Sequence, residues 1–476
     1  MTVADVSTPP ERLVLSSAAG RWVVLATILG SALAGIDSTV VTIALPAIGT
    51  DLGSSFTGLQ WTVTGYTITL AALILLGGAA GDRFGRRRVF VVGTVWFTAA
   101  SCLCALAPSI EVLVAARVLQ GVGGALLTPA SLAVIEAVFR PEDRAAAVGT
   151  WAGFSGVAAA LAPFVGGWLL ALGSWRWVFV VNLPVAVVVV AGAVRHVPET
   201  RGQTSIGPLD WRGSFATVAV LAGVTYALIE APRHSHQRLT FLALATAIGG
   251  AAVFVHTELT SPAPLLDLSL FRIREFSAAN ATTFFAYAAI GTFFFLLVLQ
   301  LQVVAGWSPL AAGASSLPVT VITLGLSRLS GRLAQRIGPR PQMTLGPVLC
   351  AAGCVLALRI TSDAHYLTDV LPAVVVFGLG LATLVAPLTA TALSAVPDSH
   401  AGVASGFNNA VARTGSLLAI AAVPTLTGIT GDAIALPQLF AIGFRTAMAV
   451  CAGLLITGSV VAAVGIPRRH TSPAHA

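Results

Sequence analysis

Lysine is absent from this chain, and charged residues of any kind are scarce. All 26 basic residues are arginine, and charged residues make up only 9% of the 476 residues. A soluble globular chain carries about 25% charge, so this composition excludes an ordinary soluble protein. With 56% hydrophobic residues and a mean hydropathy of +0.89, the sequence predicts an all-α membrane protein with many spans.

Cysteine is also rare, and the spacing of the five cysteines does not indicate a disulfide framework. Cys102, Cys104, Cys350, Cys354 and Cys451 all lie in apolar segments, where a small buried hydrophobic side chain is the ordinary interpretation. No spacing of cysteine and histidine matches a metal site, so we expect neither a metal nor a cofactor. The pI of 9.8 does not indicate nucleic-acid binding, because the arginines lie mostly in short loops between apolar runs.

Long apolar runs, in contrast, are abundant. A helix needs about 20 apolar residues to cross a membrane, and that length gives fourteen candidate spans. They cover residues 22–45, 59–80, 89–107, 111–135, 145–171, 176–194, 212–230, 239–257, 277–304, 310–329, 342–360, 369–391, 402–426 and 441–466. The longest loops between them have about 18 residues, which leaves no room for a soluble catalytic domain. We therefore do not expect an enzyme.

The distribution of arginine predicts the orientation of the spans. An even number of spans leaves both termini on one side of the membrane. If that side is cytoplasmic, nineteen arginines lie inside and five outside, while Arg117 and Arg413 fall within spans. Cytoplasmic loops are enriched in arginine, so this asymmetry predicts cytoplasmic termini. The first apolar run is too long for a cleavable signal peptide and is followed by further spans.

One arginine-rich segment occurs twice. GAAGDRFGRR at residues 78–87 matches GRLAQRIGPR at residues 331–340, and the position of Asp82 holds glutamine in the second copy. Each copy joins the second and third spans of a six-helix unit. Parallel repeats of this kind are typical of transporters that rock about a site near the membrane midplane.

The repeat also predicts how the chain is divided. Two six-helix bundles flank two inserted helices, and a cytoplasmic tail lies at each end. The predicted parts are the N-terminal tail at 1–21, the first bundle at 22–194, the inserted helices with their flanking loops at 195–275, the second bundle at 276–466 and the C-terminal tail at 467–476.

The segment AGIDSTVVTIALP places an acid, Asp37, in an otherwise uncharged run. A carboxylate at the centre of a bilayer costs roughly 2.5–3.5 kcal/mol on insertion scales. Ala34 and Val41 share its helical face, and this stripe of small residues predicts contact with other helices. Burial favours the protonated carboxyl and a nearby cation favours the charged form. Asp37 is therefore a candidate for carrying a proton across the membrane, and a permanent ion pair between helices is the alternative.

Other charges within or near the spans are few. Arg117 either pairs with Asp37 or stabilises another polar site, and Arg413 lies in the thirteenth predicted span. Glu230, Glu258 and Asp432 lie at the ends of predicted helices, so we expect no further acid in the middle of the membrane.

Several aromatic and amide residues are candidates for a substrate pocket. Aromatic faces attract organic cations, and amides orient a bound ligand. Interfacial aromatic residues and hydrogen bonds between helices are the alternative interpretations. The candidates are Trp61, Tyr66, Gln300, Asn408, Asn409 and Arg413.

Together these motifs resemble the major facilitator superfamily. Residues 78–87 match its loop signature G-x-L-x-D-R-x-G-R-[KR], with Ala80 in the leucine position. IDSTVVTIALP at 36–46 and LVAARVLQGVGGA at 113–125 are similar to motifs of the fourteen-helix drug:proton antiporter branch, the EmrB/QacA-like proteins. The resemblance extends over almost the whole chain. It implies a major facilitator fold with 14 transmembrane helices, arranged 6+2+6.

The resemblance also implies roles for particular residues. Proton coupling is assigned to Asp37 and Arg117. A conformational gate is assigned to Gly78, Asp82, Arg83, Gly85, Arg86 and Arg87. The antiporter motif of the fifth helix retains Pro163, Gly166 and Gly167, whereas Ala158 and Ala162 replace two of its glycines.

The function expected from the resemblance is proton-coupled efflux. Such an antiporter exports lipophilic, often cationic or antibiotic-like small molecules across the bacterial inner membrane, with protons and membrane lipids as its other partners. A dedicated exporter of one metabolite and a proton-coupled solute symporter remain as alternatives. A membrane receptor or enzyme requires a signalling domain or a catalytic cluster, and neither is visible in the sequence.

Overall fold

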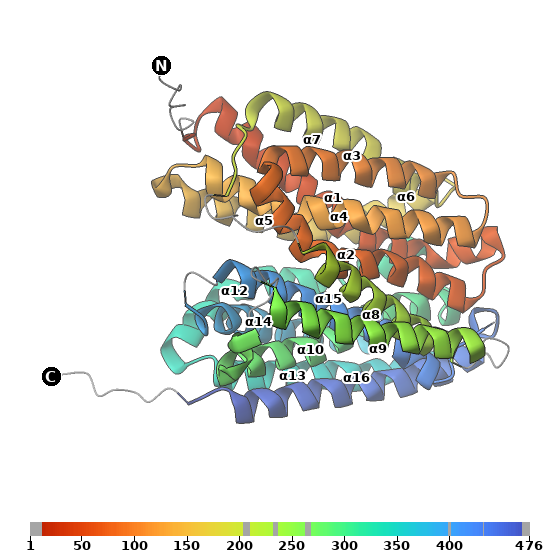
Figure 1. Cartoon of the computed structure of the whole chain (residues 1–476). Helices are drawn as coiled ribbons and strands as arrows, with labels where there is room; N and C mark the ends of the chain where they lie inside the picture. The colour runs from red at the N-terminus through yellow and green to blue at the C-terminus, as the bar shows by residue number, and fades with distance from the viewer. Residues whose placement is uncertain are drawn as a thin grey trace, which may run out of the picture.

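The protein, seen here in a computed structural model, is a bundle of long α-helices (Figure 1). The structure describes residues 12–202, 210–231, 237–261, 268–397, 401–431 and 433–468. Within these ranges the only β-type pairing is an isolated bridge between Leu13 and Phe139. The prediction of an all-α polytopic protein is confirmed. Asp432, one of the acids considered above, lies outside the described residues.

The N-terminal half contains helices of 15 to 35 residues and one short turn of helix. These are α1 (Ala18–Leu52), α2 (Phe56–Phe84), α3 (Arg86–Ala105), α4 (Ile110–Val138), α5 (Pro141–Ala171), α6 (Trp177–Val180) and α7 (Asn182–His196). Two further helices follow, α8 (Trp211–Glu230) and α9 (Gln237–Thr260). The C-terminal half contains α10 (Arg274–Leu299), α11 (Pro309–Ala314), α12 (Leu317–Ile337), α13 (Arg340–Leu356), α14 (Leu371–Ser394), α15 (Ala401–Leu426) and α16 (Pro437–Gly465).

Every one of the fourteen predicted spans overlaps a helix or a pair of consecutive short helices. By length and composition, twelve of the described helical segments can cross a membrane, or thirteen if the bent α5 is one span. The remaining segment, α15, is not among them. Asn408, Asn409 and Arg413 lower its apolar character, and we show below that they line a cavity.

Local sequence explains where several helices begin and end. The Ser17 side chain accepts a hydrogen bond from the Gly20 amide at 3.0 Å and caps the start of α1. Gly53 ends that helix with a φ of 59°, in the left-handed region that glycine adopts without a steric penalty. Gly85, with a φ of 112°, makes the sharp turn between α2 and α3.

The inserted pair lies at the junction of the two halves. α8 packs along α9 and also contacts α2 of the first half and α15 of the second (Figure 1). Only 11% of the most apolar window of α9 is buried inside the protein. In a membrane this helix therefore presents most of its surface to lipid.

The start of α1 and the end of α16 lie at the same end of the bundle (Figure 1). There the Leu13 amide donates to the Val138 carbonyl at 2.9 Å, and Arg274 Nη2 donates to the Val464 carbonyl at 2.7 Å. The loop between α2 and α3 lies at this end too. We call it the terminal end.

Hydrogen bonds join the two halves toward the opposite end, which we call the closed end. The Phe56 amide donates to the Gly431 carbonyl at 2.9 Å, and Gln60 Nε2 donates to the Ile420 carbonyl at 2.9 Å. The Phe56 ring also packs against Phe295 and Phe440 of the second half, with ring centroids 6.1 and 6.2 Å apart. This aromatic cluster packs the two halves against each other on that side.

Candidate functional site

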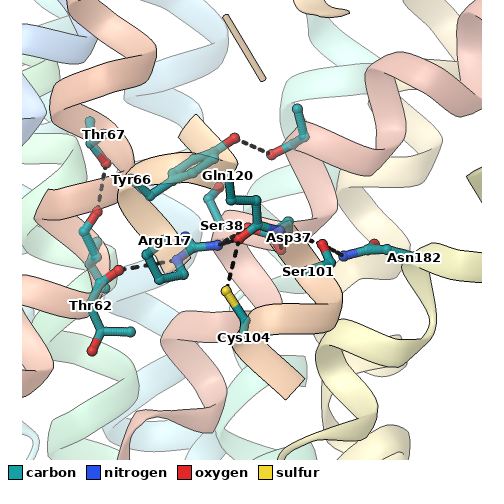
Figure 2. Close-up of polar contacts among 12 residues, drawn as sticks. Asp37, Ser38, Thr62, Tyr66, Thr67, Ser101, Cys104, Arg117, Gln120 and Asn182 are labelled. Carbon is teal, nitrogen blue, oxygen red and sulfur yellow. Dashed lines mark hydrogen bonds and ion pairs between the residues drawn. The ribbon is translucent and has the colours of Figure 1, made fainter. Parts of the chain in front are cut away.

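Asp37 and Arg117 form an ion pair in the interior of the N-terminal half (Figure 2). Asp37 lies in the middle of α1 and Arg117 in the second turn of α4, and their residues are 2% and 1% exposed. Arg117 Nη1 donates to Asp37 Oδ2, and Arg117 Nε donates to the Thr62 carbonyl of α2 at 3.1 Å. The pair therefore connects three helices through one buried guanidinium.

A network of neutral side chains surrounds this pair (Figure 2). Gln120 Nε2 donates to Asp37 Oδ1 at 2.8 Å and to Ser101 Oγ at 2.7 Å, and Gln120 Oε1 accepts from Arg117 Nη1. Asn182 Nδ2 of α7 donates to the same Ser101 hydroxyl at 3.0 Å. Gln120, Ser101 and Asn182 were not among our predicted site residues. Gln120 lies three residues after Arg117, a helical spacing that could have indicated it.

Tyr66 separates the ion pair from a central cavity. The Arg117 guanidinium carbon lies 4.3 Å from the centre of the Tyr66 ring, within the range of a cation–π contact. The Tyr66 hydroxyl donates to the Ala34 carbonyl of α1 at 3.3 Å. Because Tyr66 also lines the cavity, its ring touches the ion pair and lies at the cavity wall.

The cavity has a volume of about 590 Å³ and lies between the two halves. A volume of this size accommodates a drug-sized molecule. Polar and aromatic side chains from both halves line it together with Pro163, among them Ser38, Thr42, Tyr66, Thr67, Tyr287, Phe294, Asn408, Asn409 and Arg413. Because both halves contribute to the wall, their relative movement would change its shape.

The structure places four of the six pocket candidates in this wall: Tyr66, Asn408, Asn409 and Arg413. Asn408 Nδ2 also donates to Asn280 Oδ1 at 3.1 Å and so ties α15 to α10. The other two candidates, Trp61 and Gln300, are not among the described residues that line this cavity.

The side chains of Trp61 and Gln300 make contacts away from this cavity. Trp61 Nε1 donates to Glu230 Oε1 of α8 at 3.2 Å, so the indole lies on the α8 side of α2. Gln300 is fully buried and its Nε2 donates to the Ile360 carbonyl at 2.9 Å. The sequence identifies both side chains as suitable for ligand contact, but the rotation of each helix directs them elsewhere.

The arginine-rich loop between α2 and α3 is held at the terminal end. Asp82 accepts from Arg86 Nε at 2.9 Å and from Arg86 Nη2 at 2.7 Å, and Arg86 Nη1 reaches the Ala133 carbonyl of α4 at 3.2 Å. Gly78 lies further back on α2, and Arg83 is exposed with its guanidinium carbon 5.9 Å from the Phe84 ring centre. The loop is thus docked against the end of α4.

Glu199, which our sequence analysis did not select, completes this arrangement. It follows α7 and accepts from the Arg87 amide at 3.1 Å, with Arg87 Nε and Arg88 Nε 3.6 and 3.7 Å from its Oε2. A Cβ on Gly85 would lie 2.5 Å from Glu199 Oε1, so the loop glycine is required for this approach. The position of Glu199 shortly after a span, near an expected arginine cluster, is a weak sequence signal.

Replacing Glu199 with glutamine is expected to loosen the α2–α3 loop. Hydrogen bonds to a charged acceptor contribute about 1.5–3 kcal/mol each. Losing the charge of Glu199 should therefore lower the protection of amides 85–88 against hydrogen exchange about tenfold. Hydrogen–deuterium exchange of the purified protein measures this protection. Glu111→Gln, a change at an exposed acid at the start of α4, is the control. Unchanged protection in Glu199→Gln would show that the backbone contacts alone hold the loop.

The segment of α5 that contains Pro163, Gly166 and Gly167 forms part of the contact between the halves. Pro163 lines the cavity, and a Cβ on Gly166 would lie 3.1 Å from Val40 Cγ1 of α1. A Cβ on Gly167 would lie only 2.4 Å from Leu310 Cα of α11. The glycines therefore permit α5 to approach a helix of each half. Ala162 is fully buried in the same helix, so alanine is accommodated there.

Relatives that are similar in sequence are named for transport, efflux or antibiotic resistance. The chain is 35% identical to the probable actinorhodin transporter of Streptomyces coelicolor over 86% of this chain and 72% of that one. It is 34% identical to the puromycin resistance protein pur8 of Streptomyces alboniger over 94% of this chain and 92% of that one. It is 33% identical to the multidrug efflux pump LfrA of Mycolicibacterium smegmatis over 85% and 80%.

Solved structures share the fold at low sequence identity. A D-xylose-proton symporter superposes with a TM-score of 0.67 at 16% identity, over 94% of this chain and 98% of that one. A bacterial homologue of the human lysosomal transporter Spinster, in an inward-facing and unoccupied conformation, superposes with a TM-score of 0.67 at 18% identity. The match covers 94% of this chain and 97% of that one.

The model of the Major Facilitator Superfamily matches residues 27–420. Together with at least twelve apolar helices and the relatives above, this makes the chain a multi-pass protein of the bacterial plasma membrane. These relatives are named as a probable transporter, an antibiotic resistance protein and a multidrug efflux pump. The chain belongs to the Major Facilitator Superfamily.

Proposed function

We propose that this protein is a proton-coupled efflux antiporter that exports lipophilic, antibiotic-like small molecules. The observation that carries the proposal is the buried Asp37–Arg117 pair, which lies behind Tyr66 at the wall of the central cavity. A buried carboxylate that can gain a proton is a natural coupling group in a membrane transporter. The names of the relatives support export of antibiotics and other drugs.

Proton binding at Asp37 would act on the cavity through Arg117 and Tyr66. A protonated Asp37 no longer neutralises the guanidinium, so Arg117 relies on Gln120, the Thr62 carbonyl and the face of Tyr66. A change in the position of the Tyr66 ring would then alter the cavity wall. Coupling requires that the proton and the substrate favour different conformational states.

The orientation we propose has both termini in the cytoplasm, with fourteen spans arranged 6+2+6 as in the fourteen-helix drug:proton antiporter branch. The closed end then faces away from the cytoplasm, and the structure corresponds to an inward-facing state. In this state the proposed gate, Asp82 with Arg86 and Glu199, holds the cytoplasmic loop of the first half. In the second copy of this segment Gln335 stands where the first copy has Asp82, so the two halves would be gated differently.

A direct test measures transport in inverted membrane vesicles. With the interior made acidic, vesicles containing the protein should accumulate a radiolabelled antibiotic such as puromycin several-fold above vesicles without it, because outward proton flow drives export. In vesicles whose inverted orientation is established by a separate marker, access of added protease to a C-terminal epitope tag tests for a cytoplasmic C-terminus.

The direction of movement separates this proposal from its alternatives. Loss of preloaded drug from the vesicles under the same gradient would indicate symport instead. If a broad panel of drugs gives no accumulation, the interpretation as a dedicated exporter of one metabolite is favoured.

A further inference from the structure

The wall of the central cavity includes one cationic side chain but, among the described residues that line it, no acidic side chain. Arg413 of α15 is the charged residue in the wall, and the remaining lining residues are uncharged. Asp37 does not offset this charge, because its side chain is 0% exposed and already paired with Arg117. The cavity wall therefore has a positive charge available to a ligand.

Arg413 differs in its partners from Arg117, which is fully buried. Arg117 contacts a carboxylate, an amide oxygen and a backbone carbonyl. Arg413 donates from Nε to Asn409 Oδ1 at 3.2 Å, and among the described residues no carboxylate lies within ion-pair distance of it. A guanidinium has five N–H donors, so most of the donors of Arg413 have no hydrogen-bond acceptor among the described residues.

An arginine held at membrane depth without a counter-charge is costly, and such residues usually face substrate or water. If Arg413 served only to hold α15 in place, we would expect acceptors like those of Arg117. Its surroundings in the cavity wall instead include the aromatic side chains of Tyr66 and Tyr287. Phe294 adds a third aromatic side chain to the wall.

We propose that the cavity binds planar aromatic molecules that carry an anionic group, with Arg413 as the counter-ion. The guanidinium fork matches a carboxylate or sulfonate in a bidentate geometry. The aromatic side chains provide flat surfaces for the body of the ligand. This inference rests on the proposed function for the direction of transport, and it reverses the substrate charge that the aromatic residues suggested from sequence.

Binding of three matched compounds tests the proposal without requiring transport. The probes are anthracene-2-carboxylate, anthracene-2-carboxamide and (anthracen-2-yl)methylammonium, titrated calorimetrically at pH 7.5 into the full-length protein in nanodiscs. Empty nanodiscs provide the blank. We expect the carboxylate to bind at least tenfold more tightly than the ammonium compound, with the amide between them.

Variants of Arg413 show whether this residue sets the preference. Arg413→Gln should bring the carboxylate to within threefold of the amide, whereas Arg413→Lys should keep part of the preference. Arg445→Gln, at an exposed position on α16, is the matched control and should change nothing. Melting temperatures of all variants show that they are folded.

Several results would overturn the inference. These are equal or tighter binding of the ammonium compound, no measurable binding of the carboxylate, or an unchanged preference in folded Arg413→Gln. Because equilibrium binding needs no proton gradient, anion binding without vesicle transport would refute only the proposed antiport. Transport of a cationic drug without anion binding would refute only this inference.

Discussion

Asp37→Asn is expected to reduce gradient-driven drug accumulation in inverted vesicles to the level of vesicles that lack the protein. Asparagine keeps the size of the side chain and an oxygen that accepts from Gln120, but it cannot exchange a proton. Transport coupled through Asp37 therefore loses its driving force. Initial rates of uptake under an imposed pH gradient measure the effect.

The same substitution leaves Arg117 buried without its counter-charge. Breaking a buried ion pair costs about 3–5 kcal/mol, so reduced stability must be separated from lost coupling. The double variant Asp37→Asn with Arg117→Gln removes both charges and should recover thermal stability while remaining uncoupled. Recovered transport in the double variant would show that the pair only holds α1 and α4 together.

Asp51→Asn is the matched control. Asp51 lies on the same helix and pairs with Arg176 at 2.7 Å, but its side chain is 48% exposed. Exposed ion pairs contribute little to stability because water screens them, so this variant should retain coupled transport. Equal gradient-driven transport by wild type and Asp37→Asn would exclude Asp37 as the coupling site.

Gly167→Ala is expected to lower the transport rate at least tenfold by opening the closed end. Its new methyl group would lie 2.4 Å from the backbone of Leu310, and a backbone atom cannot move aside as a flexible side chain can. The contact between α5 and α11 joins the two halves, so the conflict separates them. The states in which this end is closed then become less populated.

Spin labels at Thr50→Cys and Leu426→Cys, both exposed positions at the closed end, report this opening as a longer inter-label distance. Gly149→Ala is the control on the same helix, because its Cβ would meet nothing within 4 Å. We expect wild-type distances and transport from it. An unchanged distance distribution in Gly167→Ala would mean that α11 adjusts locally and that the glycine does not govern closure.

The sequence by itself determined the class of the protein, the positions of its helices and its family. Apolar length is a local property, so each run of about 20 residues marks a helix without knowledge of its neighbours. The turn at Gly85 and the cluster around Asp82 are local as well. For the same reason, the stripe of small residues beside Asp37 correctly indicated a helix face buried against other helices.

Only the tertiary structure decided which side chains meet. Asp37 and Arg117 are 80 residues apart, and Glu199 reaches Arg87 over 112 residues, so neither pairing has a local signal. The rotation of each helix, which is set by packing against its neighbours, directs Trp61 toward α8 and Arg413 into the cavity. The charge of the cavity is a property of residues from several helices at once, which is why composition and motifs did not reveal it.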